Sequence, residues 1–145
     1  MNKYIGVKII EAEPMTLTNF NEKHNKVIPA TQGEDGYKVV YPDGYVSWSP
    51  KDLKKAYMQV SNNNTITVEN VDNFIARYED FTIGDKTTVV RAVLVNDFVV
   101  VESSSCVDPK NFNQEIGASI CKDRIKSKVW ELLGFLLQTA KCGIK

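Results

Sequence analysis

The sequence predicts an α+β fold: an N-terminal β-hairpin and helix module, then a helix, an antiparallel meander and a long C-terminal helix through which the chain is oligomeric. Three observations predict it. Apolar residues flank the turn formers at 42–44 and 96–97, as in β-hairpins. Apolar residues at helical spacing run through most of residues 113–139. Polar turn formers at 61–64 separate two patterned regions, so we expect two modules, residues 1–60 and 65–145.

The N-terminal module is expected to hold a small sheet and two short helices. Residues 4–12 are rich in alternating apolar residues, which predicts a strand. Thr16 is a suitable cap for a helix over residues 17–23, and the polar residues 24–35 indicate a loop. Strands at 37–41 and 45–48 follow. Ser49 and Pro50 combine a capping hydroxyl with a proline, which predicts a helix over residues 51–57.

The second module is expected to begin with a helix capped by Thr67. Apolar residues from Val68 to Tyr78 recur at 3.6-residue spacing, which predicts about three helical turns. Strands over residues 81–83, 87–95 and 98–103 then form a meander. Because residues 99–101 are three consecutive valines, we expect both faces of the last strand to be covered.

The C-terminal helix is expected to run from Asn113 to about Thr139, after a first turn opened by Asp108 and Pro109. About 26 helical residues span about 40 Å, whereas a domain of this size is about 30 Å across. Part of the apolar stripe should therefore be buried in another copy of the chain; the alternative is a break near Lys126. The stripe consists of Ile116, Ile120, Ile125, Val129, Leu132, Leu133, Leu136 and Leu137.

Composition excludes several classes of partner and location. The 145 residues include 18 Lys and Arg and 18 Asp and Glu, so no overall field attracts polymeric nucleic acid or an anionic membrane. No apolar run approaches the length of a membrane span, and the first residues lack the pattern of a signal peptide. Cys106, Cys121 and Cys142 are odd in number and scattered, which indicates reduced thiols in a cytoplasm.

Residues suited to catalysis are scarce, so we expect a binding protein without cofactor rather than an enzyme. His24, the single histidine, lies in a polar segment without an orienting partner, and no cluster has the spacing of zinc ligands. Glu11 and Glu13 would share one face of a strand, which is typical of an exposed strand end as well as of a glycosidase pair.

The segment 103–112, here called the elbow, is the strongest candidate for a ligand site. Ser103, Ser104 and Ser105 precede the helix start at Asp108 and Pro109, where unpaired backbone N–H groups and hydroxyls can hold a phosphate. Phe98 and Phe112 bracket the elbow as candidate stacking surfaces.

The three arginines lie on elements that we expect to border the elbow. Arg77, Arg91 and Arg124 could pair with phosphate, since the guanidinium fork matches a phosphate group. The alternative for each is a surface ion pair, with Glu79, Glu102 and Asp123 as partners.

Two stretches resemble small phage proteins. Residues 43–51 read DGYVSWSPK, with AY at 56–57, and resemble a module near the start of many such proteins. Residues 106–117 read CVDPKNFNQEIG, with KVWEL at 128–132, and resemble a phage family annotated by gene number. This family is similar to the first-described Thoeris anti-defence sponge, whose members sequester cyclic ADP-ribose isomers, and in some cases CBASS cyclic oligonucleotides, without cleaving them.

The resemblance implies a homo-oligomer, a dimer or hexamer assembled through paired long helices, in the host bacterial cytoplasm. It implies base stacking on Phe98, a polar contact at Asp108 and phosphate contacts at Arg77 and Arg124. The alternative function is a phage inhibitor that caps a host enzyme, and an unassigned nucleotide hydrolase is third. The candidate ligand-binding residues are Phe98, Ser103, Ser104, Ser105, Asp108, Asn111, Phe112, Arg77 and Arg124.

Overall fold

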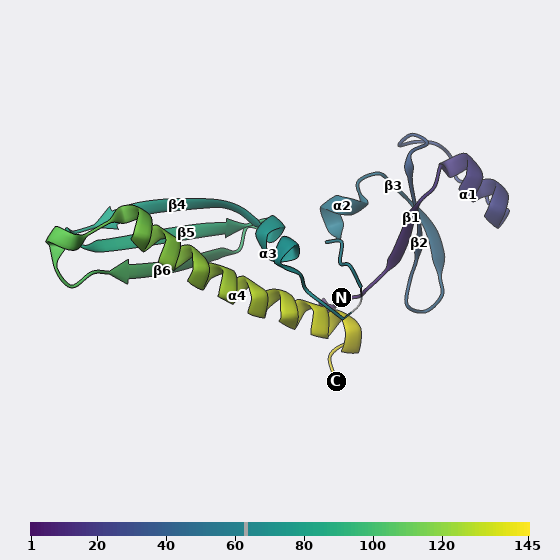
Figure 1. Cartoon of the computed structure of the whole chain (residues 1–145). Coiled ribbons are helices and arrows are strands. Elements are labelled where there is room, and N and C mark those ends of the chain that lie inside the picture. The colour runs from purple at the N-terminus through teal and green to yellow at the C-terminus, as the bar shows by residue number, and fades with distance from the viewer. Residues whose placement is uncertain (63) are drawn as a thin grey trace. The chain divides into compact units, whose positions relative to one another are not determined.

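The structure is a computed structural model that describes residues 1–62 and 64–145. The described chain divides into two compact units, which we call the N-terminal unit (residues 1–62 with 138–145) and the C-terminal unit (residues 64–137). The boundary predicted at 61–64 includes Asn63, which lies outside the described residues. Each unit contains one three-stranded antiparallel sheet, so the predicted α+β class is confirmed (Figure 1).

The N-terminal unit is built on the sheet order β1-β2-β3. Its strands are β1 (Glu11–Pro14), β2 (Gly36–Val40) and β3 (Val46–Pro50), and its helices are α1 (Leu17–His24) and α2 (Leu53–Ala56). Thr16 caps α1 as predicted, since its hydroxyl accepts a hydrogen bond from the Asn19 N–H. Leu17, Phe20 and Val39 are buried and form the small core of this unit.

Two predictions for the N-terminal unit were wrong. Residues 4–10 form no strand; β1 begins only at Glu11, where pairing with β2 starts. Pro50 does not open a helix, because it ends β3 opposite Gly36, and α2 is a single turn from Leu53. A proline at the last position of an edge strand costs the ladder little, so strand pairing prevails over the helix-start pattern.

The C-terminal unit begins with α3 (Val68–Phe74), which ends earlier than predicted. Thr67 and Asn70 form the capping box that stabilises its start. From Ile75 the chain is extended in β4 (Ile75–Ile83), so Tyr78 lies on a strand and the predicted third helical turn was wrong. Pairing of β4 with β5 along nearly its whole length accounts for the change from helix to strand.

The meander predicted from the turn formers is confirmed. Strands β4, β5 (Thr87–Leu94) and β6 (Val99–Ser105) pair in chain order. Gly84 and Asp97 adopt φ values of 65° in the two connecting turns, a conformation that glycine and aspartate tolerate.

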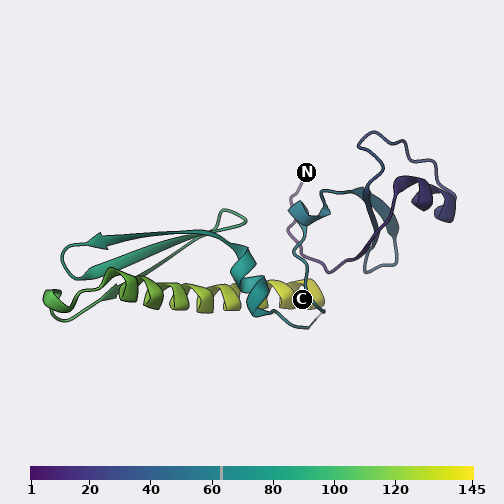
Figure 2. The same cartoon turned by 45° about the horizontal axis from the view of Figure 1, so that its top comes forward.

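The long helix is confirmed as the single element α4 (Gln114–Cys142), continuous through Lys126. Figures 1 and 2 both show α4 running along one face of the sheet of the C-terminal unit. Gly117 lies so close to Thr88 that an added Cβ would be 2.8 Å from the Thr88 Cβ. Further along α4, two ion pairs join it to other elements of the unit. Lys126 pairs with Asp72 of α3 at 3.0 Å, and Lys128 pairs with Glu102 of β6 at 2.6 Å.

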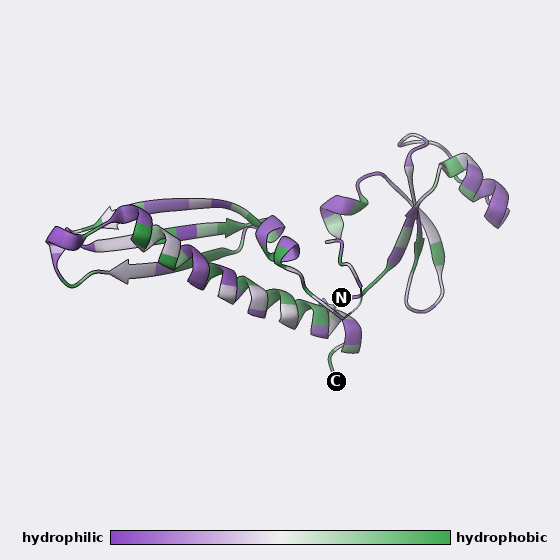
Figure 3. Ribbon diagram, in the orientation of Figure 1, coloured by the Kyte–Doolittle hydropathy of each residue, from purple (hydrophilic) through white to green (hydrophobic). Residues whose placement is uncertain are grey.

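The apolar residues of α4 do not form the one continuous stripe that was predicted. Ile125, Val129 and Leu133 are buried, together with the small residues Ala118 and Cys121. Ile116 and Ile120 are exposed, because they lie about 140° or more around the helix from Ile125. Figure 3 shows the resulting alternation of hydrophobic and hydrophilic segments along α4.

Candidate functional site

Within the C-terminal unit, no described element covers the face of the sheet opposite α4, and we call it the open face. Strand register assigns alternate residues to it, since directly paired residues share a face. In rows across β4, β5 and β6 its members are Arg77, Val93 and Val99; Glu79, Arg91 and Val101; Phe81, Val89 and Ser103; Ile83, Thr87 and Ser105.

Large apolar side chains remain exposed on the open face. Phe81, Ile83 and Val101 are 47%, 55% and 50% exposed. Within the C-terminal unit only one face of β6 is covered: Val100 is buried on the α4 side, whereas its neighbours Val99 and Val101 are exposed. An exposed apolar sheet face of this kind is typical of a binding surface.

The elbow lies at one end of this sheet, and the backbone N–H groups of residues 110–112 are engaged within its turn. The short 3₁₀ turn η1 (Pro109–Asn111) is capped by Asp108, whose carboxylate accepts a hydrogen bond from the Lys110 N–H at 2.9 Å. The N–H groups of Asn111 and Phe112 donate to the Asp108 and Pro109 carbonyls. The backbone N–H groups of Lys110, Asn111 and Phe112 are therefore not free to donate to a phosphate at the Pro109 turn as it stands in this structure.

The three elbow serines do not act together. Ser103 and Ser105 belong to the open face, whereas Ser104 pairs with buried Thr88 on the side of α4. The Ser105 and Thr87 hydroxyls are hydrogen-bonded to each other at 2.8 Å. The elbow end of the open face thus carries two exposed serines, with Asn111 exposed and Phe112 half-buried beyond them.

Phe98 lies at the other end of β6, in the turn that joins it to β5. It is 54% exposed, and its N–H donates to the Asn96 side chain at 3.2 Å. Seven residues of extended chain separate Phe98 from Ser105, a distance of about 23 Å. The structure therefore does not bring Phe98 and the elbow into one pocket within a chain, because they terminate the same strand.

Arg77 and Arg91 meet at Glu79 near the Phe98 end of the open face. The Glu79 carboxylate accepts hydrogen bonds from Arg91 at 2.9 Å and from Arg77 at 3.1 Å. The Arg91 hydrogen bond, then that of Arg77, holds the Glu79 pKa below its usual range. One carboxylate cannot neutralise two guanidinium groups, so this Arg77–Glu79–Arg91 cluster keeps a net positive charge. The ion-pair alternative raised for these arginines is thus observed at Glu79, and the cluster lies away from the elbow.

Arg124 is the one arginine that reaches the elbow region. From α4 it donates to the Ser103 carbonyl at 2.8 Å, across the β6 edge. The structure therefore divides the candidate residues into a turn end, with Phe98 and Arg77, and an elbow end, with the serines, Asp108, Asn111, Phe112 and Arg124. Glu79 was among the ion-pair partners considered from the sequence, and its position two residues after Arg77 on a strand places both side chains on one face.

Comparison with known proteins gives the chain its family. Residues 66–141 match a family described as Phage protein (N4 Gp49/phage Sf6 gene 66). The chain belongs to this phage protein family. The match covers just over half of the 145 residues and includes the sheet, the elbow and nearly all of α4. No curated protein and no solved structure gives a match.

Among the described residues, no group of three or more His, Cys, Asp or Glu side chains is arranged to hold a metal ion. Within the same residues, no helix is both long and apolar enough to cross a membrane.

Proposed function

We propose that this phage protein binds a cyclic nucleotide immune signal and holds it uncleaved in the host bacterial cytoplasm, as an anti-defence sponge against Thoeris and CBASS signalling. The ligand class is a cyclic ADP-ribose isomer, with cyclic oligonucleotides as a second class. The observation that carries the proposal is the open face, where exposed apolar side chains lie beside an arginine cluster with spare positive charge. The resemblance of the 106–117 segment to the sponge family supports the same ligand class.

The chemistry of the two ends complements such a ligand. An exposed phenylalanine ring at Phe98 offers a stacking surface for a base. Arg77 and Arg91 offer planar donors to a phosphate at the same end. At the elbow end, Asp108 can accept from a ribose hydroxyl or an adenine amine, and the serine hydroxyls can donate to phosphate. Capture needs no nucleophile or general base.

A complete site in this proposal requires two copies of the chain. Phe98 and Asp108 lie too far apart to contact one small ligand in a single chain. In a pair related by a two-fold axis, the turn end of one copy meets the elbow end of the other, which gives two equivalent sites. A dimer is the smallest such homo-oligomer, and a hexamer built from dimers keeps the same contact.

The first test separates the three functions that the sequence suggested. Purified protein is incubated with the product of a TIR-domain enzyme, washed and heated, and the released ligand is identified by mass spectrometry. Intact signal supports the sponge. A linear or hydrolysed product that grows with incubation time supports a nucleotide hydrolase, and absence of any bound signal supports a protein–protein inhibitor.

The second test asks whether the site is shared between copies. Phe98→Ala and Asp108→Ala are each expected to abolish tight binding, since loss of a stacking ring costs about 1–3 kcal/mol and loss of a hydrogen bond to a charged group costs a similar amount. When the two variants are refolded together as an equal mixture, heterodimers contain one intact site, so calorimetry should recover about a quarter of the wild-type sites. No recovery would place the site within one chain.

A further inference from the structure

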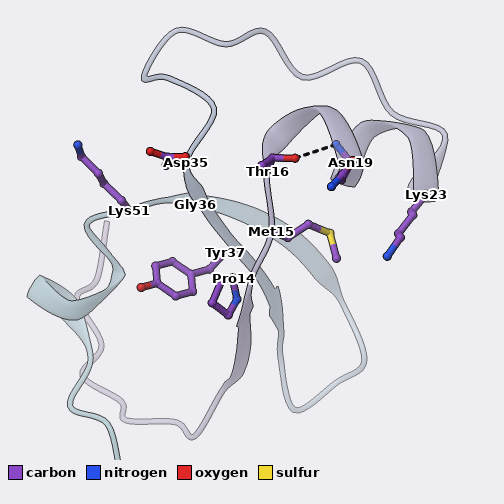
Figure 4. Close-up of a pocket in the computed structure, with 9 residues that line it drawn as sticks. All are labelled: Pro14, Met15, Thr16, Asn19, Lys23, Asp35, Gly36, Tyr37 and Lys51. Carbon is purple, nitrogen blue, oxygen red and sulfur yellow. Dashed lines mark hydrogen bonds between the residues drawn. The ribbon is translucent and has the colours of Figure 1, made fainter.

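The N-terminal unit contains a hollow that the proposed function does not use. It encloses about 500 Å³ where the end of β1, the first turns of α1 and the start of β2 meet (Figure 4). Pro14, Met15 and Tyr37 supply apolar surface, and Lys51 comes from the chain just after β3. The volume is within the usual range of small-molecule sites.

Fixed contacts from the DGYVSWSPK segment hold one side of this hollow in place. The Trp48 indole N–H donates to the Met15 carbonyl at 2.9 Å. Gly36 packs directly against the Trp48 ring, where any side chain would collide with the indole and with the Ser49 carbonyl. The Met15 N–H donates to the Gly36 carbonyl at 3.0 Å. Both Met15 and Gly36 line the hollow, so its shape is set before a ligand arrives.

The charged side chains around the hollow are two lysines and one aspartate. Within the described residues no carboxylate pairs with Lys23 or Lys51, and Asp35 is the one acidic residue of the lining. Figure 4 shows Lys23 and Lys51 at opposite ends, with Asp35 at the Lys51 end. Four other lysines of the unit are engaged: Lys38 with Glu13, Lys55 with Asp52, and Lys8 and Lys26 over the rings of Tyr41 and Tyr45.

We propose that this hollow binds a small organic phosphate that carries a flat ring, of the nucleoside monophosphate class. Two ammonium groups against one carboxylate leave a net positive charge that selects an anion. The ring lies against the Tyr37 and Met15 side chains, as aromatic and thioether groups favour. The Asp35 carboxylate accepts a hydrogen bond from a sugar hydroxyl. The site is separate from the open face, so it gives the N-terminal module a ligand of its own.

The test is an NMR titration of the full-length ¹⁵N-labelled protein with adenosine monophosphate, and with adenosine and inorganic phosphate in separate arms. We expect the monophosphate to shift the amide signals of Met15, Gly36 and Tyr37 in a saturable way, with weaker shifts from adenosine or phosphate alone. In the double variant Lys23→Gln, Lys51→Gln, the dissociation constant should rise about ten-fold. Lys54→Gln, an exposed lysine outside the hollow, is the matched control and should leave it unchanged.

Three outcomes would overturn the proposal. The first is the absence of shifts up to about 10 mM, beyond the weakest binding of interest. The second is the same dissociation constant in the wild type and the double variant. The third is inorganic phosphate shifting these signals as strongly as the monophosphate, which would leave a plain anion site with no role for Tyr37. Shifts confined to residues of the open face would also overturn it, because the hollow would then bind no ligand, while the sponge proposal would gain support.

Discussion

The close approach of α4 to β5 makes Gly117 and Gly134 a matched pair of positions. Both glycines lie within α4, so replacing either with alanine gains the same helix propensity, about 1 kcal/mol. At 134 an added Cβ meets nothing within 4 Å, so Gly134→Ala should stabilise the protein by up to that amount. At 117 the Cβ meets the Thr88 side chain, which is fully buried and cannot move into solvent.

Gly117→Ala should therefore destabilise the C-terminal unit. Overpacking of a buried site costs about 1–3 kcal/mol, which exceeds the gain in propensity. The free energies of unfolding of the two variants should differ by about 2 kcal/mol, or about 10 °C in Tm for a unit of this size. Thermal unfolding followed by circular dichroism at 222 nm measures the difference, because α4 is the longest helix. Equal stabilisation by both substitutions would show that α4 does not contact Thr88 at this position.

Two other predictions concern titration and thiol reactivity. A carboxyl NMR titration should place the Glu79 pKa below the usual glutamate range. Arg91→Gln should raise this pKa, whereas Arg124→Gln should leave it unchanged. An equal midpoint in the wild type and both variants would exclude the Arg77–Glu79–Arg91 cluster. Because the folded-state pKa is lowered, the stabilisation from Glu79 is present above the pKa of the unfolded chain and is lost as the pH falls through the lowered value. Cys121 should not react with a thiol reagent until the protein unfolds, since it is fully buried and burial raises its pKa, whereas exposed Cys142 should react at once. In the Cys142→Ser variant, the number of thiols that react in the native protein should fall by one. Rapid reaction of all three thiols in the native wild type would show that the packing of α4 against the sheet opens.

Local signals in the sequence were sufficient for most of the elements. Thr16 and Thr67 cap the helices that follow them, and the turns at 42–44 and 96–97 lie between paired strands. These features depend on residues near one another in the chain, so sequence reasoning has access to them.

Long-range pairing accounts for the errors. Residues 75–78 suit a helix and a strand equally by their apolar spacing, and pairing with β5 decides for the strand. Pro50 has the sequence pattern of a helix start, but its strand pairing with Gly36 places it in β3. On α4 the small residues Gly117, Ala118 and Cys121 form the contact with the sheet, whereas hydrophobicity alone favoured Ile116 and Ile120.

The division of the candidate site into two ends was implicit in the sequence. Phe98 precedes the strand that Ser105 ends, so an extended chain must separate them. What the sequence could not provide is the face on which each side chain lies. That depends on register, which brings Arg77, Glu79 and Arg91 together from two strands.

The meander has a consequence for how the chain folds during synthesis. Each strand of the C-terminal unit pairs with the next one along the chain, so the sheet forms from short loops with a small entropic cost. One side of that sheet, with buried Val90, Ala92, Leu94 and Val100, is covered by α4, which is synthesised after the sheet. Until α4 packs on it, the apolar side chains of this side are in contact with water, which is unfavourable. Both faces of the nascent sheet are therefore exposed until most of α4 has left the ribosome.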